Sequence, residues 1–229
     1  MRGEERLIDW IARELDGAAG TTLASGYQAT VTLHDSPWGK LAVKRARHRG
    51  LFGAASLSRE HEIYQRLSGI SGIPKTYGKL GNAALVLEYV AGSSLRAARR
   101  SLHDQDEFFD RMLQTIDAMH AAGVAHCDLK RKDNTIVGPH ETPYLVDFGV
   151  ACILREGDGW AKRKWFALMR QMDYNAWVKL RFGRDPAQLP PEVAARYSPL
   201  WLERVARWIR IPWQKLTLRR LRKKWSKRR

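Results

Sequence analysis

Asp128, Asn134 and Asp147 stand within a short stretch of the chain, with residue types that could do chemistry. Asp128 and Asn134 lie in one polar run, and Asp147 begins the tripeptide Asp-Phe-Gly further on. Transfer of a phosphoryl group from Mg-ATP needs a carboxylate that orients the attacking hydroxyl and oxygen ligands that hold the metal. Asp128 suits the first role, and Asn134 and Asp147 suit the second.

The residues ahead of this run read as helices and short strands that must bring it into position. A helical spacing of apolar residues predicts an N-terminal helix over 4–15. Alternating patterns separated by turn residues predict strands, and a second helical pattern lies between them. The expected strands cover 27–34, 40–45, 76–79 and 84–90, a basic linker covers 48–53, and the helix covers 57–68.

The second half of the chain reads mainly as helix. Helical patterns cover 94–102 and 106–122, and the polar loop over 125–134 follows them. A small hairpin is expected from 135–137 and 144–146. Everything from Trp160 onward reads as helix, with breaks at 183–191 and Pro212. Because strands come first and helices follow, the expected fold class is α+β.

The composition limits the class of protein. The chain has 229 residues, 44% of them hydrophobic, which is enough for a folded core. Its two cysteines argue against a disulfide scaffold and fit a reducing compartment. It has no apolar run long enough to span a membrane and no apolar stretch typical of a secretory signal. A cytoplasmic location is therefore expected, with peripheral binding to the inner membrane as a variant.

The positive charge is concentrated at the C-terminal end. Residues 203–229 hold twelve Lys or Arg against one acid, so they carry +11 of the net +16. Tryptophans recur among these cations over 201–229, a composition that favours anionic membrane surfaces. The equal alternative is that the tryptophans pack on the domain. Nucleic acid is not indicated, because no nucleic-acid-binding motif accompanies the charge.

The run from Met119 to Lys130, with Asp147-Phe148-Gly149 after a hairpin, resembles the protein-kinase-like superfamily. The resemblance covers about residues 20–155 and is closest to its compact atypical members, the RIO-like kinases and the kinases of lipopolysaccharide core sugars. It implies a bilobal domain over 1–229, with a β-rich N-lobe at about 16–90 and a short helical C-lobe at about 91–200. The tail over 201–229 follows.

The resemblance also implies how ATP would be held. Lys44, in Leu-Ala-Val-Lys, would bind the α- and β-phosphates, and Glu60 would pair with it, with Glu62 as the fallback. Gly26 is the one glycine placed to cradle phosphate. The backbone of Glu88 to Val90 would bind the adenine.

The same resemblance assigns roles in the catalytic loop. Asp128 would orient the acceptor hydroxyl, and Lys130 would offset charge on the transferred phosphate. Asn134 and Asp147 would bind Mg²⁺, or Mn²⁺ in its place. In the family the asparagine stands five residues after the aspartate, where this chain has Asp133, so Asp133 remains an alternative ligand.

Two departures from the family affect the expected function. Cys127 stands where regulated protein kinases carry an arginine that binds a phosphate on the activation segment, and no Ala-Pro-Glu motif follows Gly149. The first choice is an atypical Ser/Thr protein kinase. The alternatives are a lipopolysaccharide core sugar kinase at the inner membrane surface and a pseudokinase or adaptor that binds membrane or RNA.

Overall fold

The computed structural model describes residues 10, 13, 20–25, 29–46, 51–81, 84–183, 189–194 and 196–198, except for the side chains of residues 25, 51–54 and 192. Residues 10 and 13 are helical, within the helix expected over 4–15. The rest of that helix, Gly26 and the basic tail over 201–229 lie outside the described residues.

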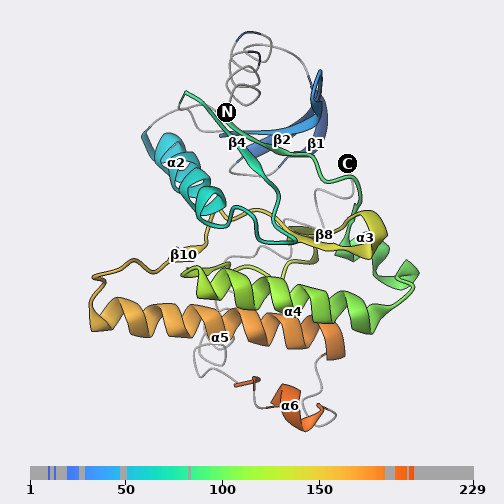
Figure 1. Ribbon diagram of the computed structural model, residues 1–229, viewed down its shortest axis with the longest axis vertical. Helices are drawn as coiled ribbons and strands as arrows, with labels where there is room; N and C mark the ends of the chain where they lie inside the picture. Colours follow the sequence, from blue (N-terminus) through green and yellow to red (C-terminus); the bar gives the residue numbers. More distant parts are fainter. Residues whose placement is uncertain are drawn as a thin grey trace, which may run out of the picture.

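An antiparallel five-stranded sheet forms the upper part of the molecule (Figure 1). Its order is β1-β2-β3-β5-β4. Four of its strands were predicted, and β1 was not. The strands are β1 (Thr21–Ser25), β2 (Ala29–Ser36), β3 (Gly39–Ala46), β4 (Thr76–Leu80) and β5 (Ala84–Glu88).

Helix α2 (Leu51–Arg66) lies beside this sheet (Figure 1). The sequence predicted a linker over 48–53 and a helix that starts at 57. Both predictions are wrong from residue 51 onward, because the helix already begins at Leu51. Gly53 caused the error, because a glycine inside a helix costs about 1 kcal/mol and reads as a break. The helix-forming residues around it outweigh that cost.

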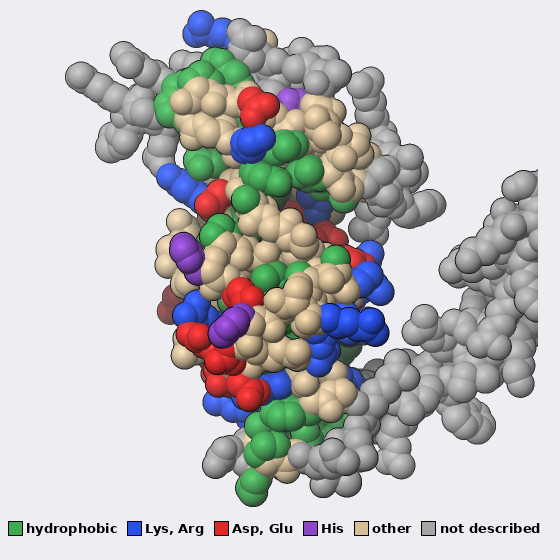
Figure 2. Space-filling view, turned by 90° about the vertical axis from the view of Figure 1, so that its right-hand side faces the viewer, with side chains coloured by type: hydrophobic (Ala, Val, Ile, Leu, Met, Phe, Trp, Pro, Cys, Tyr) green, Lys and Arg blue, Asp and Glu red, His purple; other side chains and the backbone are tan. Residues whose placement is uncertain are grey.

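The lower part of the molecule is built on two long antiparallel helices, α4 (Gln105–Ala121) and α5 (Trp160–Phe182) (Figure 1). Helix α4 begins at Asp104, whose side chain accepts a hydrogen bond from the backbone N–H of Glu107 at 2.9 Å. Acidic side chains gather near the start of α4 (Figure 2). Their negative charge stabilises the helix, because the N-terminal end of the helix dipole is positive. The shorter helices are α3 (Leu95–Ala98), η1 (Arg99–Ser101) and α6 (Pro191–Ala194).

Short strands connect the two parts around the polar loop. The predicted hairpin is present as β8 and β9, and β8 also pairs with β6. Strands β7 and β10 pair with each other and were not predicted, because two residues cannot show a period of two. The elements are β6 (Ser93–Ser94), β7 (Val124–Ala125), η2 (Lys132–Asn134), β8 (Thr135–Val137), η3 (Pro139–Glu141), β9 (Pro143–Leu145) and β10 (Cys152–Ile153).

One hydrophobic cluster runs from α2 through the interface to α4 and α5. It includes Tyr64 on α2, Met112 on α4, Trp177 on α5 and Phe148 between them, each at most 1% exposed. The rings of Tyr64 and Phe148 pack edge to face, with their centroids 5.1 Å apart. Phe148 thereby links α2 to the helical part and fixes the neighbouring Asp147. No described helix has the length and apolarity needed to cross a membrane.

Candidate active site

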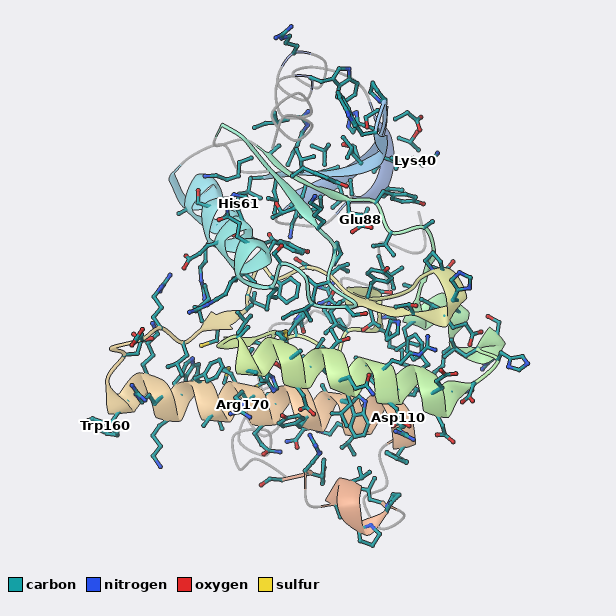
Figure 3. All side chains as sticks on the ribbon, viewed as in Figure 1. Lys40, His61, Glu88, Asp110, Trp160 and Arg170 are labelled. Atoms are coloured by element: carbon teal, nitrogen blue, oxygen red, sulfur yellow. The ribbon has the colours of Figure 1, made fainter. Side chains whose placement is uncertain are left out.

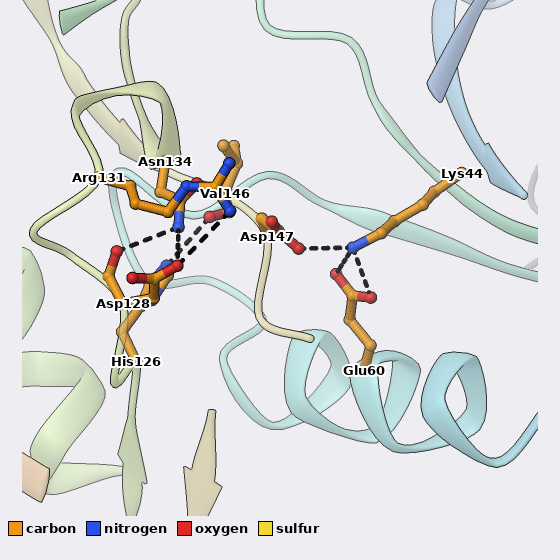
Figure 4. Close-up of polar contacts among 8 residues, drawn as sticks. All are labelled: Lys44, Glu60, His126, Asp128, Arg131, Asn134, Val146 and Asp147. Carbon is orange, nitrogen blue, oxygen red and sulfur yellow. Dashed lines mark hydrogen bonds and ion pairs between the residues drawn. The ribbon is translucent and has the colours of Figure 1, made fainter. Parts of the chain in front are cut away.

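Lys44 of β3 joins two carboxylates that come from distant parts of the chain (Figure 4). Its Nζ lies 2.7 and 2.8 Å from the two carboxylate oxygens of Glu60 and 2.8 Å from Oδ1 of Asp147. The side chains of Lys44 and Glu60 are 12% and 2% exposed, whereas Asp147 is 47% exposed. The ammonium is therefore fixed from the buried side, and the side that carries Asp147 is open to solvent.

The charges of Lys44 and Asp147 support each other, whereas burial raises the pKa of Glu60. Burial would lower the pKa of Lys44, but the carboxylates of Glu60 and Asp147 outweigh burial and raise that pKa. Burial would likewise raise the pKa of Asp147, but the ammonium of Lys44 outweighs it and lowers that pKa. Lys44 stays a cation and Asp147 an anion at neutral pH, as a phosphate-binding lysine and a metal ligand would need to be.

Glu62, the alternative partner for Lys44, lies on another face of α2. Its carboxylate forms a bidentate contact with Arg155, at 2.7 and 2.8 Å. Two further side chains of α2 bind the same segment, because Arg59 donates to the carbonyl of Ala151 and Arg66 to that of Leu154. These three contacts fix α2 in the position that brings Glu60 to Lys44.

Asp128 and Asn134 face each other across the catalytic loop (Figure 4). The amide nitrogen of Asn134 lies 3.1 Å from the backbone carbonyl of Asp128 and 3.5 Å from its carboxylate. Asp133 points elsewhere and forms a bidentate ion pair with the guanidinium of Arg96, at 2.8 and 2.9 Å. The geometry thus favours Asn134 over Asp133 as the residue that faces the site.

Asp173 of α5 supports this loop from beneath and was not found from the sequence. Its carboxylate accepts hydrogen bonds from the backbone N–H groups of His126 at 2.7 Å and Cys127 at 2.9 Å, and it lies 3.1 Å from Nε2 of His120. The available signal was an acid on the apolar face of a helix, since Met169, Ala176 and Trp177 flank it at helical spacing and are buried.

Two residues of the site have a left-handed backbone that is uncommon outside glycine. Asp147 has φ of 67° and Cys127 has φ of 69°. Aspartate tolerates this region, whereas cysteine does so at some cost. The hydrogen bond from Cys127 to Asp173 helps to hold that conformation. Burial raises the pKa of the Cys127 thiol to about 12, so this cysteine stays protonated.

His126 is fully buried and ties the catalytic loop to the residue before Asp147. Its Nε2 lies 3.0 Å from the carbonyl of Val146, which can only accept, so Nε2 carries the proton. The backbone N–H of Val146 donates to the carbonyl of Asn134 at 3.0 Å. Val146 therefore connects the two metal-ligand candidates, because its N–H binds the Asn134 carbonyl and the next residue is Asp147.

The expected adenine-binding segment follows β5, where the sheet meets the helical part (Figure 3 labels Glu88 there). Val90 is 8% exposed, and its backbone groups form no hydrogen bond with the described residues. The side chain of Glu88 accepts from the backbone N–H of Lys75 at 3.0 Å, which fixes the segment. Lys130 is exposed on the catalytic loop and contacts none of the other candidates. Gly26 lies outside the described residues.

The oxygen atoms of Asn134 and Asp147 fit a small hard cation. The second carboxylate oxygen of Asp147 has no hydrogen-bond partner among the described residues, whereas the first binds Lys44. Within the part of the chain that the structure describes, no three His, Cys, Asp or Glu residues are grouped to hold a metal by themselves. This donor set fits magnesium, which is usually held by one or two side chains together with phosphates.

Comparison with known proteins agrees with the geometry. A family model described as protein kinase domain matches residues 22–169. Mitogen-activated protein kinase kinase kinase 20 of Arabidopsis thaliana is 26% identical over 171 residues, which are 69% of this chain and 48% of that protein. Serine/threonine-protein kinase grp of Drosophila melanogaster is 27% identical over 110 residues, 44% of this chain and 21% of that protein.

A third relative, CBL-interacting serine/threonine-protein kinase 21 of Arabidopsis thaliana, is 29% identical over 90 residues, 38% of this chain and 21% of that protein. The chain thus spans less than half the length of each of these relatives. The match to the family model confirms the predicted α+β kinase fold. The chain belongs to the protein kinase domain family.

Proposed function

We propose that this chain transfers the γ-phosphate of ATP to a serine or threonine hydroxyl of a protein. The observation that carries the proposal is the placement of two groups joined through Val146: Lys44 with Glu60 and Asp147, and Asp128 with Asn134. The first group suits a triphosphate and its metal, and the second suits the attacking hydroxyl. Two of the named relatives are serine/threonine-protein kinases by name, which supports a protein acceptor.

Each residue of the site has a distinct part in the proposed reaction. Lys44 binds the α- and β-phosphates, with its position set by Glu60. The unpaired backbone groups of Val90 bind the adenine edge. Asp128 accepts a hydrogen bond from the acceptor hydroxyl and orients its oxygen toward the γ-phosphate, and Lys130 offsets charge on the transferred group.

Asn134 and Asp147 would hold Mg²⁺, with Mn²⁺ as a substitute. The metal would neutralise charge on the phosphates during transfer. Asp147 suits this part because its lowered pKa keeps it ionised and one of its oxygens is available. Cys127 replaces the arginine through which the activation segment would act, so activity should need no phosphorylation of that segment.

The experiment that tests the proposal is transfer of label from γ-labelled ATP in the presence of Mg²⁺. Protein and membrane-glycolipid fractions are offered together and separated before counting. Label on protein, including the enzyme itself, supports the proposal. Asp147→Asn should abolish metal-dependent transfer while the far-UV circular dichroism stays unchanged. Absence of label on any acceptor, or an Asp147→Asn variant as active as wild type, would favour a binding protein instead.

The connection between Gly149 and α5 favours a second candidate, a kinase of lipopolysaccharide core sugars. Only residues 150–159 separate them, and β10 and three α2 side chains already hold part of that segment. Little chain is left to form a platform for a peptide. Label on glycolipid with little on protein would support this candidate. Deletion of residues after Pro212 should then remove binding to anionic vesicles.

A further inference from the structure

The catalytic loop carries three consecutive cations immediately after Asp128 and Leu129: Lys130, Arg131 and Lys132. A terminal nitrogen of Arg131 lies 3.7 Å from Oδ2 of Asp128, and the Arg131 side chain is 58% exposed (Figure 4). The Arg131 charge also acts on Asp147 and helps to lower the pKa of that carboxyl. Arg131 therefore faces the point where the acceptor hydroxyl would arrive.

The guanidinium of Arg131 still has unused donors. Its contact with Asp128 is an ion pair that is too long for a hydrogen bond, and its side chain donates no hydrogen bond to the described residues. An arginine carries five N–H donors in a planar fork that fits a carboxylate or phosphate. Arg96, close by in space, has already used its fork on Asp133. Arg131 is thus free to receive an anion.

The local charge balance favours an anionic ligand as well. The second acid of the loop, Asp133, is neutralised by Arg96. Lys130 and Lys132 form no ion pair with the described residues, and Asp128 is the one carboxylate that faces Arg131 closely. The acceptor side of the loop therefore carries a net positive charge next to the reacting position, which attracts acidic groups.

We infer that Arg131 determines acceptor specificity by binding an acidic side chain adjacent to the acceptor hydroxyl. This inference rests on the proposed function and names its substrate class, a serine or threonine flanked by Glu or Asp. The hydroxyl and the acid must lie close together, because both are received within a few ångströms of the Asp128 carboxylate. Consecutive Cα atoms are about 3.8 Å apart, so the acid stands within one or two residues of the acceptor.

The test compares peptides that share one serine and differ at the two residues on either side. One set carries Glu there, one Gln and one Lys. Wild-type enzyme should show a kcat/KM for the best Glu peptide about twofold to fivefold above that of its Gln counterpart, as one partly exposed ion pair provides. Arg131→Gln should bring this ratio close to one. Arg131→Glu should reverse it in favour of the Lys peptide.

Lys164→Gln is the matched control, because Lys164 is an exposed cation on α5 away from the catalytic loop. It should keep the wild-type ratio. Both Arg131 variants should keep the wild-type melting temperature, since the side chain is exposed and packs against no core residue. A Glu preference that survives in Arg131→Gln, or equal kcat/KM values in wild type, would overturn the inference.

Fluorescence anisotropy of the labelled peptides separates this inference from the proposed function. Tighter binding of the Glu peptide to wild type than to Arg131→Glu, without any phosphate transfer, would support the subsite and overturn the proposed function. Transfer to Glu and Gln peptides at equal rates would leave the function standing and overturn the subsite. Label that appears on glycolipid alone, with no binding of the Glu peptide, would overturn both.

Discussion

The carboxylate of Asp173, in the middle of α5, accepts a hydrogen bond from the backbone N–H of Cys127 at 2.9 Å. The donor sits directly before Asp128 in a left-handed conformation, with φ of 69°. A second bond, from the N–H of His126 at 2.7 Å, goes to the other oxygen of the same carboxylate. Asp173, which is 1% exposed, therefore anchors the start of the catalytic loop to α5 within the same helical part.

Asp173→Asn should destabilise the fold more than an ordinary polar change would. An amide presents one oxygen and one NH₂ group, so at least one buried backbone N–H loses its acceptor and faces a donor. The free energy of unfolding should fall by about 2 to 3 kcal/mol, the cost of such an unsatisfied group. Urea unfolding followed by tryptophan fluorescence measures this loss.

Asp110→Asn serves as the control for that measurement. Asp110 pairs with Arg181 on α5, but its side chain is 58% exposed. Exposed pairs contribute about 0 to 1 kcal/mol, so this change should have little effect. Equal losses in the two variants would contradict the role given to Asp173.

Glu60→Gln should impair catalysis, whereas Glu62→Gln should have a small effect. Glu60 holds Lys44 from a buried position, and loss of a hydrogen bond between charged groups costs about 2 kcal/mol, or about thirtyfold in kcat/KM for ATP. Glu62 pairs with Arg155 in an exposed position, so its loss should cost less than about fivefold. Steady-state rates at varied ATP concentration give both values. A larger effect from Glu62→Gln would show that the anchoring of α2 matters more than the charge on Glu60.

Much of the fold was readable from the sequence because the strands and long helices carry clear periodic patterns. The hairpin of β2 and β3 and helix α4 began and ended close to their predicted limits. The start of α2 was missed because Gly53 read as a break. Strands β7 and β10 were missed because their pairing is decided by tertiary contacts and two residues hold no pattern.

The candidate site was readable as far as local motifs reach. Short runs named Lys44, Glu60, Asp128, Asn134 and Asp147, and the structure brings them into two contacting groups joined through Val146. The sequence could not choose between Asp133 and Asn134, because the choice depends on which side chain points into the site. Arg96 of α3, 37 residues away in the sequence, binds Asp133 and holds it away from the site. Asp173 stands outside every catalytic motif, and long-range contacts of this kind are not encoded by local spacing.

Asn134→Ala should weaken the metal dependence of the reaction much more than Asp133→Ala. Asn134 is 3% exposed and faces Asp128, whereas Asp133 is engaged by Arg96 at the surface. Removal of one of two side-chain ligands should raise the Mg²⁺ concentration for half-maximal activity by about tenfold or more. Asp133→Ala should change it by less than about twofold. A Mg²⁺ titration of ATP turnover measures both, and the reverse order would make Asp133 the ligand.

Cys127 should react slowly with iodoacetamide at any pH near neutrality. Only the thiolate reacts, and burial raises the pKa of this thiol from 9.0 to about 12. At pH 9 the folded protein should therefore react at least about a hundredfold more slowly than the same cysteine in the unfolded chain. Peptide mapping after timed alkylation separates Cys127 from Cys152.

The sign of the pH dependence follows from the same pKa. Folded and unfolded chains both carry a neutral thiol below pH 9, so the contribution of Cys127 to stability is complete there. Between pH 9 and about pH 12 the unfolded chain loses the proton first, and this contribution falls as pH rises. The alkylation rate of folded Cys127 should keep rising over this interval. A rate that levels off near pH 9 would contradict the raised pKa.

Gly92→Ala should destabilise the connection between the two lobes. A Cβ at this position would lie 2.1 Å from the backbone carbonyl oxygen of Val137 and 3.1 Å from the Cα of Gly138, and backbone atoms cannot turn aside as a side chain can. Strand β6, which begins at the next residue, would have to move away from β8. The free energy of unfolding should fall by about 1 to 3 kcal/mol. The KM for ATP should rise because the proposed adenine-binding segment, Glu88 to Val90, ends two residues before Gly92. Gly159→Ala is the matched control, since a Cβ there meets no atom within 4 Å. If both variants unfold at the same urea concentration as wild type, the close approach of Gly92 to β8 does not constrain the hinge.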